Sequence, residues 1–316
     1  MIKKLLIGTV AISLAATLSL AQDAVRFNVA KGDKEVAYNK MINEQIEDIG
    51  FVLSDPHERI NDGYAKKYGS TSLDNLGFFS VANDEVLREL LMKAPELGGF
   101  SPFNLHIYKR KSEDKTYVGH VDPKVMLNIV GVTDKKISET FIASFNPLDA
   151  LVQKSIGGKV EYLGFDNLPK EPMMKFEMQI ERGDDLSEFI DEFQEQFEAV
   201  FEEHKYIIAG YKNFKETYED MEADFSKYDA YFVYSLCHFK FSEGIFNQGR
   251  PDAGVFAPCS MYLYIEKGSN TMKIGMPKLQ NWVSVMNIKD KKMVNSVKEL
   301  DKEIIKLMQG MGAKVK

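Results

Sequence analysis

The sequence predicts an α+β protein built from two tandem repeats of an antiparallel sheet backed by helices. Three observations lead to this class: a residue pattern that occurs twice, strand and helix signals that alternate along the chain, and a hairpin signal in each repeat. The pattern recurs without a gap at an offset of 156 residues, as Gly98/Gly254, Phe100/Phe256, Pro102/Pro258, Tyr108/Tyr264, Gly119/Gly275 and the Asp-Lys-Lys runs at 134–136 and 290–292. Such a long period indicates two domains of one fold rather than a solenoid.

Length and composition agree with two domains. A chain of 316 residues suits domains of roughly 100 to 200 residues each. With 44% hydrophobic and 28% charged residues, the chain has the composition of an ordinary globular protein. We expect a signal peptide at 1–21, a first repeat at 22–150, a linker at 151–172 and a second repeat at 173–316. The linker is placed on the glycines and prolines of residues 157–172.

Hydrophobic periodicity predicts the same order of elements in both repeats. For the first repeat we expect strands at 25–29, 50–53, 76–82, 103–108 and 116–121, and helices at 35–49, 56–67, from Asn83 to about 97, and 134–150. For the second we expect strands at 173–180, 206–211, 230–239, 260–265 and 271–276, and helices at 184–203, 214–225 and 290–308.

The N-terminus has the pattern of a cleaved secretory signal. Lys3 and Lys4 precede an apolar stretch at 5–20, and Ser19-Leu20-Ala21 forms a small-residue cleavage site before Gln22. No cysteine follows the apolar stretch to carry a lipid, and no later stretch is long and apolar enough to span a bilayer. We therefore expect a periplasmic or secreted protein with no membrane span after cleavage.

The formal net charge of −7 and the sequence pI near 5.5 argue against a nucleic-acid partner, because phosphate binding needs clustered Lys and Arg. The helix expected at 184–203 has a strongly acidic outer face. Such a face is usually solvated, although a basic partner or divalent cations would also suit it. The basic C-terminal helix of this chain, with Lys298, Lys302 and Lys306, is an equally suitable neighbour.

The hairpin regions resemble a bacterial family known as domain of unknown function 302. In the second repeat the resemblance rests on residues 256–259 (Phe-Ala-Pro-Cys), Tyr264, residues 275–277 (Gly-Met-Pro) and the closing helix. In the first repeat it rests on residues 100–102, Tyr108 and residues 119–123. The resemblance implies a compact α+β domain, often paired as a dimer, and no settled activity. This chain departs from the family's simplest form in its duplication and in its long acidic helix.

Known catalytic motifs are missing from the sequence. His57-Glu58 begins like a zinc-protease helix, but the second histidine of that motif would have to stand at Asn61. The sequence has no Cys-x-x-Cys, no glycine-rich phosphate loop and no Gly-x-Ser-x-Gly. We therefore favour a binding protein over an enzyme, and we expect no cofactor.

His106 and His120 are the first candidates for a metal site. If the hairpin is centred near Glu113, the two histidines lie opposite each other on one face of the sheet, at about 4.5 to 5.5 Å between Cβ atoms. Two imidazoles at that distance can share a transition metal. The second repeat has Tyr262 and Met276 at these places, and no third ligand is identified, so a packed or solvated pair without metal is the alternative.

The only two cysteines, Cys237 and Cys259, both fall in the second repeat, where their counterparts in the first are Val81 and Phe103. In an exported chain, two cysteines in one small domain favour a disulfide. The alternatives are two buried free thiols or a metal site that includes His238.

Taken together, these features predict an exported two-domain binding or interaction module whose duplicated sheets form an internal pseudo-dimer. Its partner would be a protein or a small molecule that the sequence does not identify. One alternative is a periplasmic metal-binding or redox accessory protein that uses the cysteines and histidines above. Another is an enzyme with a site between the domains.

Overall fold

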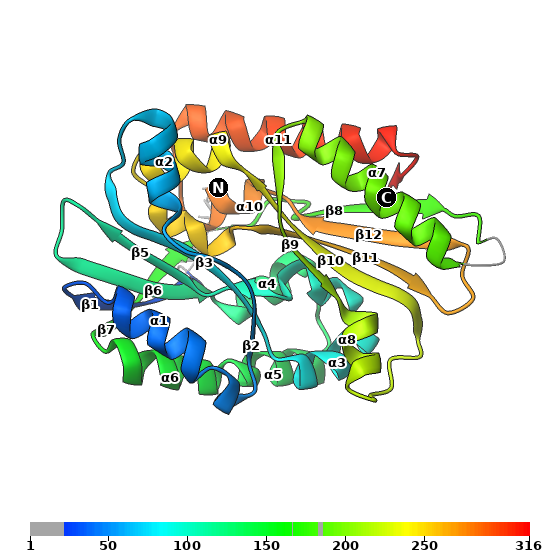
Figure 1. Cartoon of the computed structure of the whole chain (residues 1–316), viewed down its shortest axis with the longest axis horizontal. Helices are drawn as coiled ribbons and strands as arrows, with labels where there is room; N and C mark the ends of the chain where they lie inside the picture. Colours follow the sequence, from blue (N-terminus) through cyan, green and yellow to red (C-terminus); the bar gives the residue numbers. More distant parts are fainter. Residues whose placement is uncertain (1–21, 166, 183–185) are drawn as a thin grey trace, which may run out of the picture.

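The computed structural model describes residues 22–165, 167–182 and 186–316. Within them the chain forms two antiparallel sheets, each with helices packed on it (Figure 1), which confirms the α+β class. The predicted signal peptide lies outside the described residues.

The first sheet has the strand order β2-β3-β5-β6-β1-β7, with β4 paired to β3. Its strands are β1 (Gln22–Lys31), β2 (Val52–His57), β3 (Leu73–Ala82), β4 (Phe103–Asn104), β5 (His106–Arg110), β6 (Lys115–Val121) and β7 (Lys159–Phe165). β7 falls inside the predicted linker, where residues 151–156 also belong to a helix. Because β7 pairs with β1, residues 159–165 are part of the first sheet and not a free connection.

The second sheet repeats this order strand for strand. Its strands are β8 (Met173–Gln179), β9 (Tyr206–Asn213), β10 (Tyr228–His238), β11 (Cys259–Glu266), β12 (Thr271–Pro277) and β13 (Lys314–Val315). They are ordered β9-β10-β11-β12-β8-β13, so each strand has a counterpart at the same place in the first sheet. The peptide bonds before Pro102 and Pro258 are both cis.

The helices also follow one order in both halves. The first half has α1 (Glu35–Glu44), η1 (Glu47–Ile49), α2 (Ile60–Tyr68), α3 (Asp84–Lys93), η2 (Pro95–Phe100), α4 (Pro123–Val130), α5 (Lys135–Ser144) and α6 (Asn146–Ile156). The second has α7 (Leu186–Glu203), α8 (Phe214–Asp220), α9 (Phe239–Ser242), η3 (Glu243–Asn247), η4 (Pro251–Phe256), α10 (Gln280–Val285) and α11 (Lys291–Gly310). The single helix expected at 134–150 is two helices, because Pro147 has no N–H to continue α5 and stands instead in the first turn of α6.

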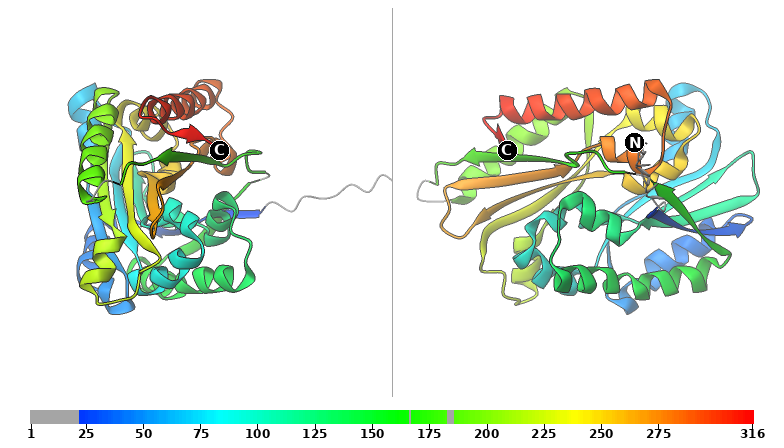
Figure 2. Two further views of the ribbon diagram at one scale, coloured as in Figure 1. Left: turned by 90° about the vertical axis from the view of Figure 1, so that its right-hand side faces the viewer. Right: turned by 180° about the vertical axis from the view of Figure 1, so that it is seen from behind.

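The closing helices lie on opposite sides of the molecule. Figures 1 and 2 show α11 along one long side, and α5 and α6 along the other. Equivalent aspartates begin them: Asp134 accepts a hydrogen bond from the Ile137 N–H, and Asp290 accepts one from the Met293 N–H. An aspartate at this position satisfies a backbone donor that the helix itself leaves unpaired.

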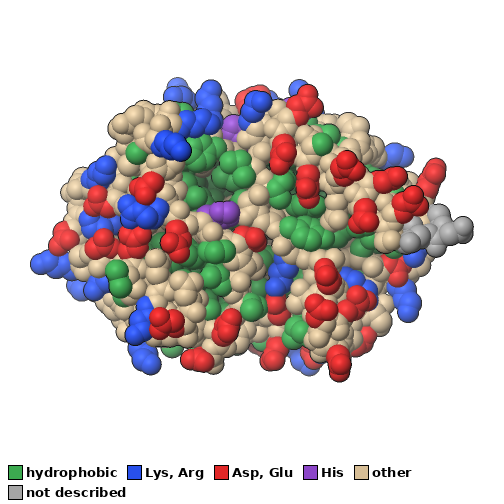
Figure 3. Space-filling view, in the orientation of Figure 1, with side chains coloured by type: hydrophobic (Ala, Val, Ile, Leu, Met, Phe, Trp, Pro, Cys, Tyr) green, Lys and Arg blue, Asp and Glu red, His purple; other side chains and the backbone are tan. Residues whose placement is uncertain are grey.

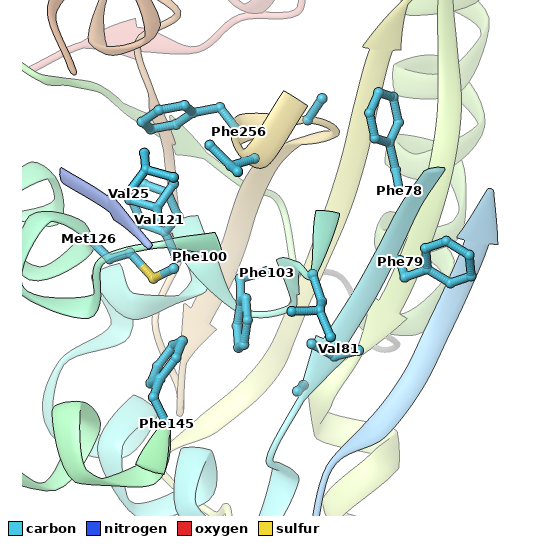
Figure 4. Packing of buried hydrophobic residues seen from close by; sticks show 14 of the residues in the cluster. Val25, Phe78, Phe79, Val81, Phe100, Phe103, Val121, Met126, Phe145 and Phe256 are labelled. Atoms are coloured by element: carbon cyan, nitrogen blue, oxygen red, sulfur yellow. The ribbon is translucent and has the colours of Figure 1, made fainter. Parts of the chain in front are cut away.

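Both faces of the second sheet are buried, against different partners. Phe232, Tyr234 and Leu263 pack into a core with the apolar sides of α7 and α11. Tyr231, Tyr262 and Tyr264 belong instead to the large core that includes the first half. Figure 4 shows part of that core, with Phe103 facing Phe145 at 4.6 Å between ring centroids.

Equivalent segments cross between the halves. η2 of the first half packs on β11 and β12, and η4 of the second half packs on β3, β5 and β6. A Cβ on Gly98 would lie 2.7 Å from the Tyr262 Cβ, and one on Gly254 would lie 2.5 Å from the His106 Cε1. Because Gly98 matches Gly254 and Tyr262 matches His106, these two close approaches are counterparts, and the repeated glycines are explained by a lack of room for any side chain.

Polar contacts across the junction also reach equivalent prolines of the two halves. The Tyr231 hydroxyl donates to the Pro95 carbonyl at 2.5 Å, and the His106 Nε2 lies 2.8 Å from the carbonyl of Pro251, which is the counterpart of Pro95. The edge strands β2 and β9, also counterparts, meet where the His57 Nε2 contacts the Ala209 carbonyl at 2.5 Å.

Candidate functional site: two equivalent grooves

A groove of about 710 Å³ lies between α3 and α5 in the first half. We name it groove 1. Its apolar lining is Val86 and Leu90 from α3 and Ile137 from α5. Its polar lining is Glu85, Glu89 and Lys93 from α3, with Asp134, Lys136 and Thr140 from the start of α5.

A second groove, of about 620 Å³, lies between α9–η3 and α11 in the second half. We name it groove 2. Its apolar lining includes Phe241, Ile245, Met293 and Leu300. Its remaining lining is His238, Lys240, Glu243, Gly244, Gln248, Asp290, Lys292, Ser296 and Glu299. Figure 1 shows α3 and α5, which line groove 1, on one side of the molecule, and α9 and α11, which line groove 2, on the opposite side.

The two grooves are lined by the same positions of the repeat. In the sheets, Val81 lies opposite Phe103 and Leu236 opposite Cys259, which gives an offset of 155 residues along β3 and β10. With this offset for α3, and 156 for α5, every residue that lines groove 1 has a counterpart lining groove 2. The pairs are Glu85/Lys240, Val86/Phe241, Glu89/Gly244, Leu90/Ile245, Lys93/Gln248, Asp134/Asp290, Lys136/Lys292, Ile137/Met293 and Thr140/Ser296.

The two grooves also share their ionic groups at the start of the closing helix. One oxygen each of Asp134 and Asp290 accepts the helix N–H at 2.9 and 2.8 Å. Among the described residues, no ion pair engages the ammonium groups of Lys136 and Lys292. Other charges have neighbours outside the lining: Glu89 lies 3.5 Å from Arg88, and Glu299 lies 2.9 Å from Lys302.

The sequence signalled these grooves only through the repeated Asp-Lys-Lys run. The wall formed by α3 in one half and by α9–η3 in the other has few identical residues, so no single motif marks it. The equivalence of these walls is also hard to see in the sequence because their offset is 155 residues, whereas the repeated motifs have an offset of 156. The same difference makes Ala82, rather than Val81, the counterpart of Cys237.

The predicted pairing of His106 with His120 is wrong. In the hairpin, His106 lies opposite Gly119, and His120 lies opposite Arg26 of β1. A shift of one residue moves a side chain to the other face of a sheet. His106 therefore faces η4 and His120 faces α6, where its Nε2 lies 3.0 Å from an Asp149 oxygen.

His106 is fully buried where the two halves meet. Its Nδ1 lies 3.0 Å from the Gly77 carbonyl and its Nε2 2.8 Å from the Pro251 carbonyl. Burial lowers the pKa of His106 to about 4, against the smaller opposing effect of these carbonyls and of Asp252. A neutral ring donates through one nitrogen only, so it makes one of the two bonds.

The first half buries a charged cluster under α6. Arg26 Nη1 lies 3.1 Å from Asp149 and donates to Asn28 at 2.7 Å, and Asp149 also contacts His120. Arg26, Asn28 and His120 are at most 9% exposed. Neither Arg26 nor Asp149 belongs to a sequence motif, so neither is among the predicted site residues.

Cys237, His238 and Cys259 come together around one apolar cavity of about 20 Å³ at the end of β10. Both cysteines are free thiols in the structure, and the predicted disulfide stays a prediction for oxidised protein. The register places Leu236 rather than Cys237 opposite Cys259. Burial raises the pKa of Cys237 to about 11 and that of Cys259 above its usual value.

His238 is occupied by a structural contact. Its Nδ1 accepts a hydrogen bond from the Phe241 N–H at 3.2 Å and so begins α9, and burial lowers its pKa. Within the described ranges, no three His, Cys, Asp or Glu side chains are placed to hold a metal ion.

The acidic side chains of α7 gather on one part of the surface, seen on the right of Figure 3. Among the described residues, no ion pair joins α7 to α11, so the basic C-terminal helix does not neutralise it. Among all residues that the structure describes, no helix is both long and apolar enough to cross a bilayer.

Comparison with known proteins finds similarity in the second half of the chain. Residues 185–311 match the model of the domain of unknown function DUF302. A crystal structure of an uncharacterized conserved DUF302 protein from Bacillus stearothermophilus is similar at 20% sequence identity and a TM-score of 0.36. The similarity covers 44% of this chain and 96% of that protein. A search among curated proteins finds no match.

Proposed function

We propose that this protein is an exported binding module whose two halves are both DUF302-like domains and form an internal pseudo-dimer. The identical strand order and the exchange of η2 and η4 support the pseudo-dimer. The signal-like pattern of residues 1–21 supports export. In this proposal, grooves 1 and 2 are two binding sites of one kind.

The observation that carries the proposal is the equivalent lining of the two grooves. Both are hundreds of cubic ångströms in volume, as small-molecule sites are, and each combines a small apolar group of side chains with polar and charged ones. The shared fold alone places the two pairs of helices alike, so the support comes from the residues that both linings keep: Asp134/Asp290, Lys136/Lys292 and a hydroxyl at Thr140/Ser296.

Methyl NMR on the full chain tests the proposal, because the apolar lining carries methyl groups in both grooves. With 2-phenylethanol as an uncharged probe, we expect shifts at Leu90 and Ile137 and at Ile245 and Met293. Thr140→Phe fills groove 1 only, so it should remove the first pair of shifts and keep the second. Shifts scattered over the surface, or none at these methyl groups, would contradict the proposal.

A second candidate is a metal-binding accessory protein that uses Cys237, His238 and Cys259, which line one cavity but, in the described part of the chain, are not placed to hold a metal ion together. Thiolate and imidazole together suit zinc or copper. Metal analysis of protein purified without an affinity tag separates the two candidates. The binding module should be free of metal, whereas one bound metal per chain that is lost in Cys259→Ser would favour the accessory protein.

A further inference from the structure

We infer that grooves 1 and 2 bind an α-amino acid with an apolar side chain, an inference that rests on the proposed binding function. The two grooves can recognise the same ligand only through what they share. Shared features are the apolar lining, a hydroxyl at Thr140 or Ser296, and one Asp and one Lys at the start of the closing helix.

The remaining charges differ between the grooves. Glu85 corresponds to Lys240, Glu89 to Gly244 and Lys93 to Gln248. Only Asp134/Asp290 and Lys136/Lys292 keep the same charge at the same place. A ligand common to both grooves therefore meets one carboxylate and one ammonium group, which suits a molecule that carries one positive and one negative charge next to an apolar group.

The lysines stand where they do not help their helices. They fall in the first turn, where the helix dipole favours Asp and Glu and disfavours cations. Lys136 and Lys292 also lack an ion pair among the described residues to offset this cost. Their presence in both halves is explained if each ammonium binds the ligand carboxylate, which the same dipole and the free N–H groups of the first turn also attract.

Each aspartate has one oxygen available for the ligand. The helix N–H takes one oxygen of Asp134 and one of Asp290, and among the described contacts the second oxygen is unpaired. In the bound state that oxygen accepts from the ligand ammonium. The ligand side chain then lies on Val86, Leu90 and Ile137 in groove 1, or on Phe241, Ile245 and Met293 in groove 2.

Three probes of matched size test the inference on the full chain. L-phenylalanine carries both charges, phenethylamine lacks the carboxylate, and 3-phenylpropanoate lacks the ammonium. Titrations followed at the methyl groups of Ile137 and Met293 should show phenylalanine binding about two- to fivefold more tightly than either analogue, the range expected for one exposed ion pair. Equal or tighter binding of either analogue would overturn the inference.

Single variants assign the effect to residues. Lys136→Gln should weaken phenylalanine binding in groove 1 by a similar factor and leave groove 2 unchanged, and Lys292→Gln should do the reverse. Lys135→Gln is the matched control, because Lys135 is exposed on the same turn and does not line the groove. Asp134→Asn removes the charge and keeps a residue that caps helices well, so it should weaken phenylalanine binding without unfolding α5.

Different results would contradict the amino-acid inference and the binding function. If 2-phenylethanol shifts the groove methyl groups but phenylalanine has no advantage, the inference is overturned and the binding function stands. An equal loss of affinity in Lys135→Gln and Lys136→Gln would also overturn it. If no probe shifts these methyl groups, both the binding function and the inference are contradicted.

Discussion

The two halves of this protein share one fold but fill one part of it with opposite chemistry. Beneath the closing helix of the first half lie Arg26, Asn28 and His120, in contact with Asp149. The strand registers place Met174, Phe176 and Met276 at the same three positions of the second half. These three apolar residues are at most 2% exposed. The fold thus needs no charge at these positions, and the first half keeps charges there at a cost in desolvation.

What the halves keep in common is equally informative. The pairs Gly98/Gly254 and Phe100/Phe256 lie in η2 and η4, which cross to the other half. The pairs Asp134/Asp290 and Lys136/Lys292 line the grooves. The shared residues therefore mark contacts between the halves and a surface site, whereas the interior beneath the closing helices diverged.

The largest effect is expected from filling the space at the crossing glycines. Gly98→Ala and Gly254→Ala each place a methyl group within 2.7 Å of atoms in the other half, so each should lower the free energy of unfolding by about 3 kcal/mol. Gly310→Ala is the control, since a Cβ there meets nothing within 4 Å. Denaturant unfolding measures all three. A large loss in only one of the two crossing variants would show that the crossings are not equivalent.

Breaking the charged cluster should come next. Arg26→Met leaves Asp149 without its Arg partner and should cost about 2 to 3 kcal/mol of unfolding free energy. Converting the whole cluster to the chemistry of the second half, with Arg26→Met, Asn28→Phe, His120→Met and Asp149→Ile together, should recover most of that loss, because a buried ion pair exchanged for packed apolar residues is often neutral or stabilising. If the fourfold variant is less stable than Arg26→Met alone, the two interiors are not interchangeable.

A smaller, pH-dependent effect is expected from His106. Its pKa is lowered to about 4 in the folded state, against about 6.5 when unfolded, so between these values the unfolded chain binds the extra proton. The contribution of neutral His106 to the free energy of unfolding is complete above pH 6.5. It falls as the pH drops towards 4, by about 2 kcal/mol at pH 5. Comparing unfolding at pH 7 and pH 5, His106→Gln should lose less stability on acidification than the parent protein. The surface variant His204→Gln should behave as the parent does, and an unchanged pH dependence in His106→Gln would contradict the assignment.

The smallest expected effect is on cysteine reactivity. Burial raises the pKa of both thiols, so alkylation of the folded protein at pH 8 should be slow. Protein denatured without reductant should then take up two alkyl groups by mass, as expected for the free thiols of the structure. Uptake of no alkyl group would establish the disulfide that the sequence predicts.

The sequence was sufficient for the α+β class because periodicity and the ungapped repeat report local structure directly. It was insufficient for the hairpin register, since a one-residue difference in the turn at 111–115 places His106 and His120 on opposite faces of the sheet instead of on the same face. It also missed β7, because the glycines and prolines of 157–172 indicate a linker, whereas the pairing of Val160 with Asn28 is not visible in local composition. The grooves could not be predicted from the sequence for a related reason, because their walls join segments about 45 residues apart.

The reciprocal crossing of the two halves is the central claim, and nuclear Overhauser contacts from the two glycines test it most directly. With selectively labelled glycine, tyrosine and histidine in the full chain, the Gly98 Hα should show a contact to the Tyr262 Hβ, and the Gly254 Hα to the His106 Hε1. Observation of both contacts is the predicted result. If Gly98 contacts only protons of the first half and Gly254 only protons of the second, the halves do not exchange segments and the account is contradicted.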